Sequence, residues 1–349
     1  MIAYYAHNHG NGHSNFANQF VKAKSKDSII MTSSKFKFDN VPIIKLTEEY
    51  MVEEDYIFNY LPLPEYAHYL PKNHLNLAIR NQEITTAIIQ KNIGFAMIDV
   101  SVETAAIFRL SGVPYAYRRM IGNRNDKAHT IAYKAAEFLF AYYPKELEAK
   151  NTPEWVIKKT KYSGFLSRFN YEQNLDFITL AKKPISELNI LILAGMGGTR
   201  INNDLIEKIA KETKSKSISV IGGINNYTIK NKANIYYLGY QQNIEEHIKA
   251  ADLVISSCGL SLSSEILALK NKFIAVPEKR PFLEQELFCK SLVRDNLAVE
   301  LNISNIYESI QQFLELKPNP NIATYFSSMH SFIESNIAYN SVQCHKEFQ

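Results

Sequence analysis

The sequence predicts an α/β protein built from two domains, and three observations support this. The chain has 349 residues, which is more than one typical small core contains. In both halves, short uninterrupted apolar runs precede turns of small residues and then helical segments, as in parallel sheets covered on both faces. The composition, with 46% hydrophobic and 21% charged residues, is that of a soluble globular protein.

Composition also narrows the classes of function. The net charge of +4 and the pI of about 8.6 suit anionic substrates or an acidic membrane surface, but are too weak to indicate nucleic acid. The three cysteines have no metal-ligand spacing, and their odd number argues against a disulfide framework. We find neither a signal peptide nor an apolar run long enough to span a membrane. We therefore expect a cytoplasmic protein, with peripheral contact at the inner face of the cell membrane left open.

In the first half, apolar runs alternate with turn residues and helical segments. The pattern predicts a first strand at 2–6, a Gly- and Asn-rich turn at 7–14 and a helix at 15–24. It further predicts strands at 28–32, 42–46, 96–100 and 138–143, a turn and strand at 110–117, and helices at 75–90 and from 101–104. The segment 50–74 has prolines, tyrosines and no clean period, so it is either a binding excursion or an aromatic-packed surface insertion.

The first turn carries the best candidate for acid–base chemistry. Its spacing is not that of the dinucleotide fingerprint, and its histidines lack the cysteine or carboxylate partners of a zinc site. Because imidazole titrates near neutral pH, we interpret His13 as a general base. The alternative is that His13 only caps the helix or lines a cleft.

Charged residues follow two later strands of the first half. Asp99 and Glu103 lie near the carboxyl end of a strand, where open α/β sheets bind ligands, and are alternative candidates for the base. Arg119, Arg124 and His129 follow the next strand and are candidates for binding an anionic acceptor. A salt-bridged surface loop is the equally weighted alternative.

In the second half, the same alternation starts again after a polar segment at 169–188, which we interpret as a linker. Strands are predicted at 189–194, 218–222, 235–238, 253–255, 273–276 and 297–300, and helices from about 203, before 251, after 259, from 284, at 306–316 and at 325–339. The glycine turn 195–199 leaves room for backbone N–H groups to approach a diphosphate, although it lacks the lysine of an NTPase loop.

The stretch 251–285 carries the strongest signal of function. Small residues at 256–259 let a ligand approach the backbone, and hydroxyls follow at a helix start, where free N–H groups attract anions. Glu265 then presents a carboxylate suited to a ribose diol, and Glu284-Gln285 opens the next helix with groups that suit sugar hydroxyls. Each of these features alone also occurs for purely structural reasons. The indication of function comes from their combination in this order.

The string SSCGLSLSSEILALKNKFIAVP, followed by EQ, resembles the nucleotide-sugar-binding segment of GT-B glycosyltransferases. It is most similar to the family 28 type that contains the lipid II-forming N-acetylglucosaminyltransferase, and Gly10 to His13 match the G-x-G-H turn of that family. The series D-V-S-V-E, G-V-P and G-N-R-N-D-x-x-H looks like a bacterial subgroup. The resemblance implies two Rossmann-like domains facing across a cleft, with a C-terminal helix returning to the first domain. The implied division is 1–168, a linker at 169–188, 189–324 and 325–349.

The resemblance also implies roles for single residues. Glu265 would hold the ribose, and Glu284 and Gln285 would face the donor sugar. The remaining donor-side candidates are Gly197, Gly198, Thr199, Tyr240, Ile244, Ser257, Gly259, Leu260 and Ser261. Gly12 would lie with Arg119, Arg124 and His129 on the acceptor side.

The expected activity is transfer of a sugar from a nucleoside diphosphate sugar, by analogy UDP-linked, to a glycan or lipid-linked acceptor in bacterial cell-surface glycan or glycolipid synthesis. Inversion at the anomeric centre is implied by the resemblance. No D-x-D occurs, so we expect no metal and no cofactor beyond the donor, with amide dipoles and basic residues stabilising the diphosphate. The alternatives are a nucleotide-sugar hydrolase or epimerase, and a sensor without turnover. The poor dinucleotide fingerprint disfavours an NAD-linked oxidoreductase.

Overall fold

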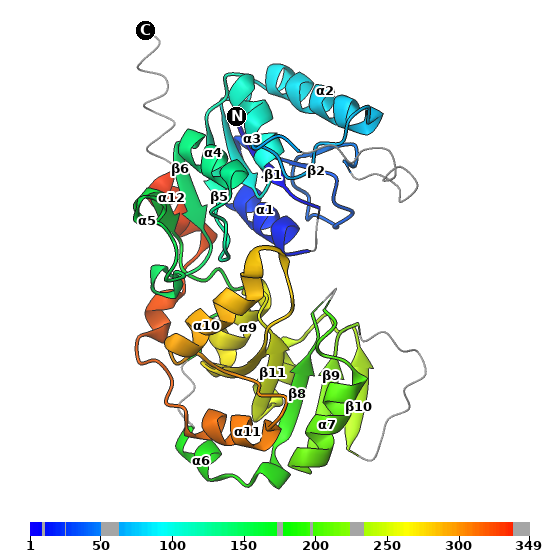
Figure 1. The fold of residues 1–349 in the computed structure, drawn as a ribbon, viewed down its shortest axis with the longest axis vertical. Helices are drawn as coiled ribbons and strands as arrows, with labels where there is room; N and C mark the ends of the chain where they lie inside the picture. Colours follow the sequence, from blue (N-terminus) through cyan, green and yellow to red (C-terminus); the bar gives the residue numbers. More distant parts are fainter. Residues whose placement is uncertain are drawn as a thin grey trace.

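Two parallel β-sheets, one in each half of the chain, form the frame of this computed structural model (Figure 1). The structure describes residues 1–8, 11–24, 26–49, 63–172, 177–195, 198–223 and 234–337. Gly10 and Gly197, named above, lie outside these residues, as do the third cysteine, Cys344, and the 50–62 part of the proline-rich segment. Within the described ranges, no helix has both the length and the apolarity needed to cross a membrane.

The first sheet has seven strands in the order β3-β2-β1-β4-β5-β6-β7. Its strands are β1 (Ile2–Ala6), β2 (Ser28–Thr32), β3 (Ile43–Lys45), β4 (Phe95–Asp99), β5 (Tyr115–Arg118), β6 (Phe138–Ala141) and β7 (Thr160–Tyr162). The helices of this half are α1 (Asn11–Ala23), α2 (Leu75–Gln90), α3 (Val102–Leu110), α4 (Lys127–Ala135) and α5 (Glu154–Lys159). All strand pairs in it are parallel, as the uninterrupted apolar runs predict.

The second sheet has six strands in the order β10-β9-β8-β11-β12-β13, again all parallel. Its strands are β8 (Asn189–Leu193), β9 (Ser217–Ile221), β10 (Ile235–Gly239), β11 (Leu253–Ser257), β12 (Phe273–Val276) and β13 (Ala298–Glu300). The helices of this half are α6 (Phe177–Lys182), α7 (Asn203–Thr213), α8 (Glu245–Ala250), α9 (Leu260–Lys270), α10 (Glu284–Arg294), α11 (Ile306–Glu315) and α12 (Met329–Asn336).

Strand β1 shows why these runs are apolar without alternation. Its side chains point alternately to the two faces of the sheet, and both faces are covered. Tyr4 packs in a cluster with Phe16 and Phe20 of α1, whereas Tyr5 packs on the opposite face in a cluster with Phe108 of α3. A strand buried on both sides therefore needs an apolar residue at every position.

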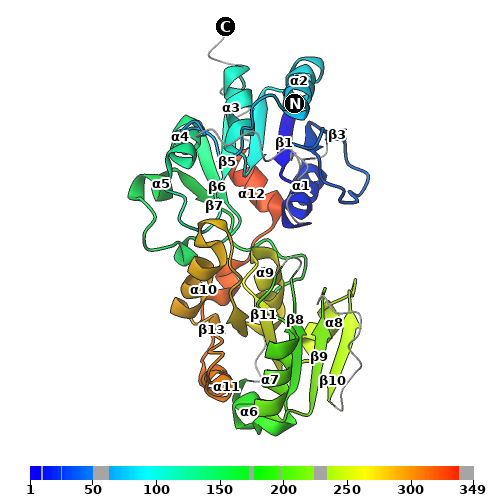
Figure 2. The same cartoon turned by 45° about the vertical axis from the view of Figure 1, so that its right-hand side comes forward.

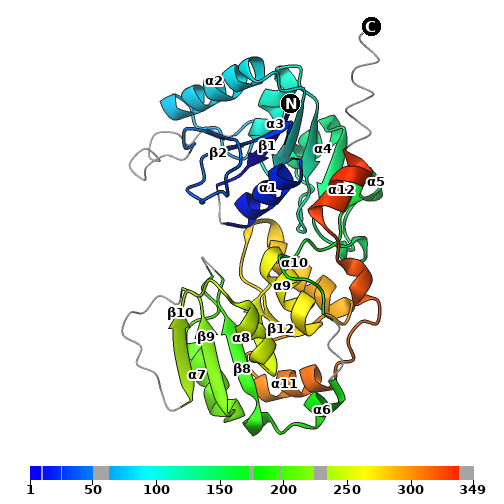
Figure 3. The ribbon, with the colours of Figure 1, turned by 180° about the vertical axis from the view of Figure 1, so that it is seen from behind.

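Helix α12 returns from the second half to the first sheet, as expected. Met329, Phe332 and Ile333 are buried in the same cluster as Phe16 and Phe20 of α1. Figures 2 and 3 show α12 beside α1, distant from the sheet that precedes it in sequence. The first core is thus completed by residues from the far end of the described chain.

Some elements differ from the prediction. Helix α1 begins at Asn11, four residues earlier than expected, so Gly12 and His13 lie in its first turn rather than in a preceding loop. Glycine and asparagine are weak helix formers, but propensity yields to tertiary packing. The predicted linker contains α6 and two buried side chains, Ile185 and Leu188. Elements α4, α5 and β7 were not predicted.

The strand order positions a site at the carboxyl ends of both sheets. Chain order reverses between β1 and β4 in the first sheet and between β8 and β11 in the second. Open parallel sheets bind ligands in the crevice that forms at such a reversal. The two reversals face each other, because a Cβ on Gly12, just after β1, would lie 3.5 Å from Ser261, just after β11.

Candidate active site

His13 and Asp99 meet where the first sheet reverses its strand order. His13 lies in the first turn of α1 and Asp99 is the last residue of β4. The Nδ1 atom of His13 lies 2.8 Å from Oδ1 of Asp99, and the imidazole is 15% exposed. This contact fixes the ring while leaving its other nitrogen to react, the usual arrangement of a general base.

Asp99 is fully buried and its carboxylate is already bonded on both oxygens. Arg118 donates from Nη1 to Oδ2 at 2.7 Å, and the Tyr4 hydroxyl donates to Oδ2 at 3.2 Å. Burial acts to raise the pKa of Asp99, but the Arg118 guanidinium and His13 together lower it below its usual value. Asp99 therefore stays ionised, and the position of its carboxylate suits orienting His13 rather than contacting a substrate.

Arg118 was not among the predicted site residues, although its role in the pair is clear. Its guanidinium is buried between the rings of Phe16 and Tyr142, at 4.5 and 4.8 Å. Val100, directly after Asp99, has a φ of 66°, which is unusual for a β-branched residue. Backbone strain of this kind concentrates at functional sites.

The amino end of α9 faces this pair from the second sheet. Its N-cap is Gly259, which offers no side chain to the free N–H groups, whereas α7 and α11 are capped by Asn202 and Asn305. The Oγ of Ser263, in the first turn, is buried and has no hydrogen-bond partner. Uncapped amides and an unpartnered hydroxyl leave hydrogen-bonding capacity for an anion.

Glu265, also on α9, is held by Arg168 at the end of the first domain. Arg168 Nε lies 2.9 Å from Oε1 of Glu265, and its Nη2 lies 3.2 Å from Oε2. The Glu265 side chain is 13% exposed, and burial raises its pKa although Arg168 opposes the shift. A largely buried carboxylate with a half-exposed partner can exchange that partner for a ligand.

Glu278, which sequence reasoning missed, organises the glycine turn. Its carboxylate accepts hydrogen bonds from the backbone N–H groups of Thr199 and Arg200 at 3.0 to 3.1 Å, and from Ile201 at 3.4 Å. A Cβ on Gly198 would lie 2.5 Å from Oε1 of Glu278, so the absent side chain permits the contact. Of the turn 195–199, whose amides we expected to face a diphosphate, the N–H of Thr199 is therefore already occupied by a carboxylate.

Glu284 and Gln285 point in different directions: Gln285 is buried within the second domain, and Glu284 points toward the first. The amide oxygen of Gln285 is buried and accepts from the N–H groups of Cys258 and Glu278, at 3.1 and 2.9 Å. It thereby ties the ends of β11 and β12 together. The carboxylate of Glu284 instead reaches across to the first domain, where Arg124 donates to it at 2.9 Å.

The three charged or titratable acceptor-side candidates are all buried and partnered. Arg119 makes a two-point ion pair with Glu148, inside the first domain. Arg124 lies 4.7 Å over the ring of Phe282, and its Nη1 lies 3.3 Å from Nε2 of His129. Burial, followed by the charge of Arg124, lowers the pKa of His129 to about 4. Arg124 and His129 both contact Phe282 of the second domain, whereas the ion pair of Arg119 stays within the first.

The other candidates fall into three groups. Glu103 accepts from the backbone N–H groups of His68 and Tyr69, so it holds a loop. Tyr240 and Thr199 are exposed, with Tyr240 75% accessible. The third group has apolar or small side chains: Ile244, Ser257 and Leu260. Ile244 and Ser257 are buried, and Leu260 packs against the core of the first domain.

The segment that carries the second sheet matches a known family model. Residues 189–332 match the glycosyltransferase family 28 C-terminal domain. The matched segment runs from β8 into α12. Its α9 amino end, Glu265 and the Glu284-Gln285 pair all lie within the matched residues, so the predicted resemblance is confirmed there.

Two curated relatives extend the comparison. The chain is 30% identical over 121 residues to the UDP-N-acetylglucosamine–N-acetylmuramyl-(pentapeptide) pyrophosphoryl-undecaprenol N-acetylglucosamine transferase of Sulfurihydrogenibium sp., covering 34% of each protein. It is 29% identical over 91 residues to the enzyme of the same name from Clavibacter michiganensis, covering 25% of each. The chain thus matches about a third or less of the length of these relatives.

Solved structures extend the similarity in fold to nearly the whole chain. The MurG protein of Acinetobacter baumannii has a TM-score of 0.62 at 12% identity, covering 96% of this chain and 98% of its own. The spinosyn rhamnosyltransferase SpnG has a TM-score of 0.64 at 10% identity, covering 96% and 99%. The fold is therefore that of two-domain GT-B proteins, and the match to the family 28 C-terminal domain lies in its second half.

Proposed function

We propose that the protein is a glycosyltransferase that moves a sugar from a nucleoside diphosphate sugar, with UDP favoured, to an acceptor hydroxyl. The observation that carries this proposal is the His13–Asp99 pair, which lies opposite the uncapped amino end of α9 in a family 28 domain. One side supplies a base and the other supplies an anion site. Group transfer from an activated sugar needs both.

The mechanism follows from the hydrogen bonds of His13. Its Nδ1–H donates to Asp99, so its Nε2 is the unprotonated nitrogen that takes the proton from the acceptor hydroxyl. The deprotonated oxygen attacks the anomeric carbon as the bond to the diphosphate breaks. Backbone N–H groups at the start of α9 stabilise the negative charge that develops on the leaving group. A single displacement of this kind inverts the anomeric centre.

Donor recognition is assigned to the family 28 domain. Glu265 binds the ribose hydroxyls after releasing Arg168, whose half-exposed side chain is free to return to solvent. Glu284 faces the sugar, while Gln285 supports the turns after β11 and β12. Tyr240 and the backbone at Ile244 lie beside the base. Glu278 fills the amides of Thr199 to Ile201, so the diphosphate depends mainly on α9.

The names of similar proteins inform the choice of substrates. The curated relatives are named as transferring N-acetylglucosamine from its UDP derivative to a lipid-linked acceptor, and one solved neighbour is complexed with thymidine diphosphate. We extend this to a UDP-sugar donor and a glycan or lipid-linked acceptor in cell-surface glycan or glycolipid synthesis. The reaction would take place in the cytoplasm, at the membrane surface. The division at 168 and 188 into acceptor and donor domains is part of the proposal.

A donor screen followed by a turnover assay tests this function. Thermal shift against UDP-, GDP-, dTDP- and CMP-sugars should show stabilisation by one nucleotide class, since binding to the folded state raises the melting temperature. Release of the nucleoside diphosphate should then depend on added acceptor fractions. Equal release without acceptor would indicate a hydrolase. Stabilisation without turnover under any acceptor would indicate a sensor, and stabilisation by none of the four would remove the proposal.

A further inference from the structure

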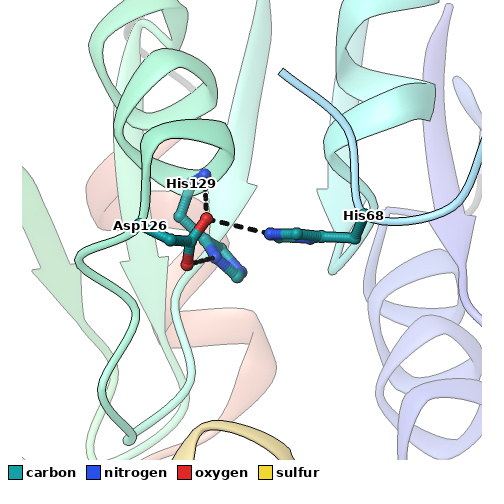
Figure 4. Close-up of side chains that lie close together, drawn as sticks. All are labelled: His68, Asp126 and His129. Atoms are coloured by element: carbon teal, nitrogen blue, oxygen red, sulfur yellow. Dashed lines mark hydrogen bonds and ion pairs between the residues drawn. The ribbon is translucent and has the colours of Figure 1, made fainter. Parts of the chain in front are cut away.

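A second cluster of titratable side chains lies where the first domain packs against Phe282 of the second, apart from the His13–Asp99 pair. Asp126 stands between two imidazoles, with Oδ1 at 2.9 Å from Nε2 of His68 and Oδ2 at 2.6 Å from Nδ1 of His129 (Figure 4). One nitrogen of each ring and a carboxylate oxygen all lie within 4.8 Å of one another. The proposed transfer reaction uses none of these groups.

Each of the three side chains is held in place by contacts outside the cluster. The backbone N–H groups of His68 and Tyr69 both donate to Glu103, at 2.6 and 2.9 Å, which fixes the loop carrying His68. Asp126 is the N-cap of α4 and accepts from the N–H of His129. The ring of His129 is buried and packs edge-on against Phe282, with centroids 4.9 Å apart. The cluster is therefore preorganised, and only Asp126 and His68 reach solvent.

We propose that His68, Asp126 and His129 bind one divalent transition-metal cation of the zinc class. Imidazole nitrogen and carboxylate oxygen are the ligands that zinc, nickel and cobalt ions share. Three protein ligands leave at least one coordination position for water or for an incoming oxygen ligand. Such a site in the first domain lies outside the family 28 match, which covers residues 189–332.

The present geometry needs only a small change to accept such an ion. Zinc lies about 2.0 to 2.2 Å from nitrogen and oxygen ligands, so neighbouring ligand atoms in a tetrahedral site are about 3.3 Å apart. The separations of 2.9 and 2.6 Å, which involve different oxygens of Asp126, must open by less than about 1 Å. The wider separations among the three ligand atoms, which are at most 4.8 Å, must close by at most about 1.5 Å. In the same step each neutral ring moves its proton to its other nitrogen, so no proton is released. For His68 that nitrogen is Nδ1, and for His129 it is Nε2.

Arg124 sets the affinity of this site through His129. Its Nη1 lies 3.3 Å from Nε2 of His129 and can donate to that nitrogen only while it carries no proton. When Nδ1 of His129 binds the ion, its Nε2 carries the proton, so this N–H and the N–H of Arg124 are two donors that face each other. A metal-bound imidazole prefers an acceptor at this position. Arg124→Gln removes the opposing donor and its positive charge, so this variant should bind the ion more tightly than the wild type.

Metal titration of the tag-free, chelator-treated full-length protein tests the proposal. Calorimetry with Zn²⁺, together with metal analysis after dialysis, should give one ion per chain, and Co²⁺ should give the visible absorption of a four- or five-coordinate site. His68→Ala and Asp126→Asn should weaken binding at least tenfold. Asparagine keeps the helix cap, and His68 is partly exposed, so both variants should fold. His330→Ala removes an exposed histidine paired with Glu334 and is the matched control.

The outcomes separate cleanly. One ion per chain, lost in His68→Ala and Asp126→Asn, retained in His330→Ala and strengthened in Arg124→Gln, supports the site. Absence of stoichiometric binding in the wild type would overturn it. So would affinity that is unchanged in both ligand variants, because the ion would then be bound elsewhere.

Discussion

Arg124 and Glu284 form an ion pair across the two domains, with Nη2 of the arginine 2.9 Å from Oε2 of the glutamate. The arginine is 8% exposed and the glutamate 26% exposed. Beside them, the N–H of Asn123 donates to the carbonyl of Phe282 at 2.6 Å. These contacts join the loop after β5 in the first domain to the segment at the start of α10.

The coupling between Arg124 and Glu284 is measurable by a double-mutant cycle. We expect Arg124→Gln and Glu284→Gln to interact by about 1 kcal/mol in the free energy of unfolding by urea, because the pair is largely removed from water. The surface pair Lys158–Glu154, which is 73% and 79% exposed, is the control and should give a coupling of about 0.3 kcal/mol. Equal couplings for the two pairs would contradict a specific link between the domains.

Replacing His13 should separate binding from turnover. In His13→Ala, we expect kcat to fall by about 10²- to 10⁴-fold, the usual contribution of a general base, with donor affinity largely unchanged. Calorimetry with the donor and initial-rate measurements with the acceptor check the two quantities. Equal loss of donor binding in His13→Ala and in Glu265→Ala would contradict the division of roles between the domains.

Asp99→Asn should inactivate His13 without removing it. Arg118 donates to Oδ2 at 2.7 Å, so the asparagine turns its oxygen toward Arg118 and its NH₂ toward Nδ1 of His13. The imidazole then carries its proton on Nε2, where the base must be free, and kcat should fall by about 100-fold or more. Asp39→Asn, an exposed carboxylate paired with Lys22, serves as the control for steady-state rates. A variant with a wild-type kcat would remove Asp99 from the mechanism.

Glu265 should strengthen donor binding at the expense of the donor-free fold. In the proposed function Glu265 holds the ribose, so we expect Glu265→Ala to weaken donor binding by about 10- to 100-fold. Burial raises the pKa of this carboxyl above its usual 4.5, so the unfolded chain releases the proton more readily than the folded one. The folded state is therefore penalised at neutral pH, and the penalty is relieved as pH falls through the raised pKa toward 4.5.

The pH dependence of Glu265→Gln checks that sign. The donor-free variant should melt at a higher temperature than the wild type at pH 7, and the difference should shrink as pH falls toward 4.5. Differential scanning calorimetry of both proteins at matched pH values measures it. If the difference in melting temperature grew toward acid pH, the effect of Arg168 on the pKa of Glu265 would outweigh the effect of burial.

Glu278 should stabilise the glycine turn through its charge. In the wild type both carboxylate oxygens accept from backbone N–H groups, and Glu278→Gln replaces one of these oxygens by an NH₂ donor. We therefore expect the free energy of unfolding to fall by about 1–3 kcal/mol. Hydrogen exchange of the amides of Thr199, Arg200 and Ile201 should become faster, whereas Glu315→Gln on the exposed end of α11 should leave it unchanged. Unchanged protection in Glu278→Gln would show that these bonds do not hold the turn.

The fold was largely predictable because its strands are buried on both faces. Runs such as 189–193 and 273–276 have no alternation, and each is bounded by a turn of small or breaking residues. Elements without this signal were missed. Strand β7 has only three residues, one of them exposed, and α1 was shortened because Gly12 suggests a turn although packing against β1 extends the helix.

The site was predictable residue by residue but not in its pairings. His13 and Asp99 were both candidates, yet their contact spans 86 positions and depends on Arg118 being buried beside them. Glu278 follows a proline in a polar loop, where a charged residue is usually solvated, and only the fold brings three amides to it. Local sequence gives no sign of contacts that distant segments create.

The return of α12 has a consequence for synthesis on the ribosome. The first sheet emerges early, but the apolar surface over Phe16, Phe20 and Phe140 stays uncovered until Phe332 and Ile333 have been translated. The nascent first domain is therefore incomplete throughout the synthesis of the second, and a chaperone has an exposed aromatic surface to shield for that whole period.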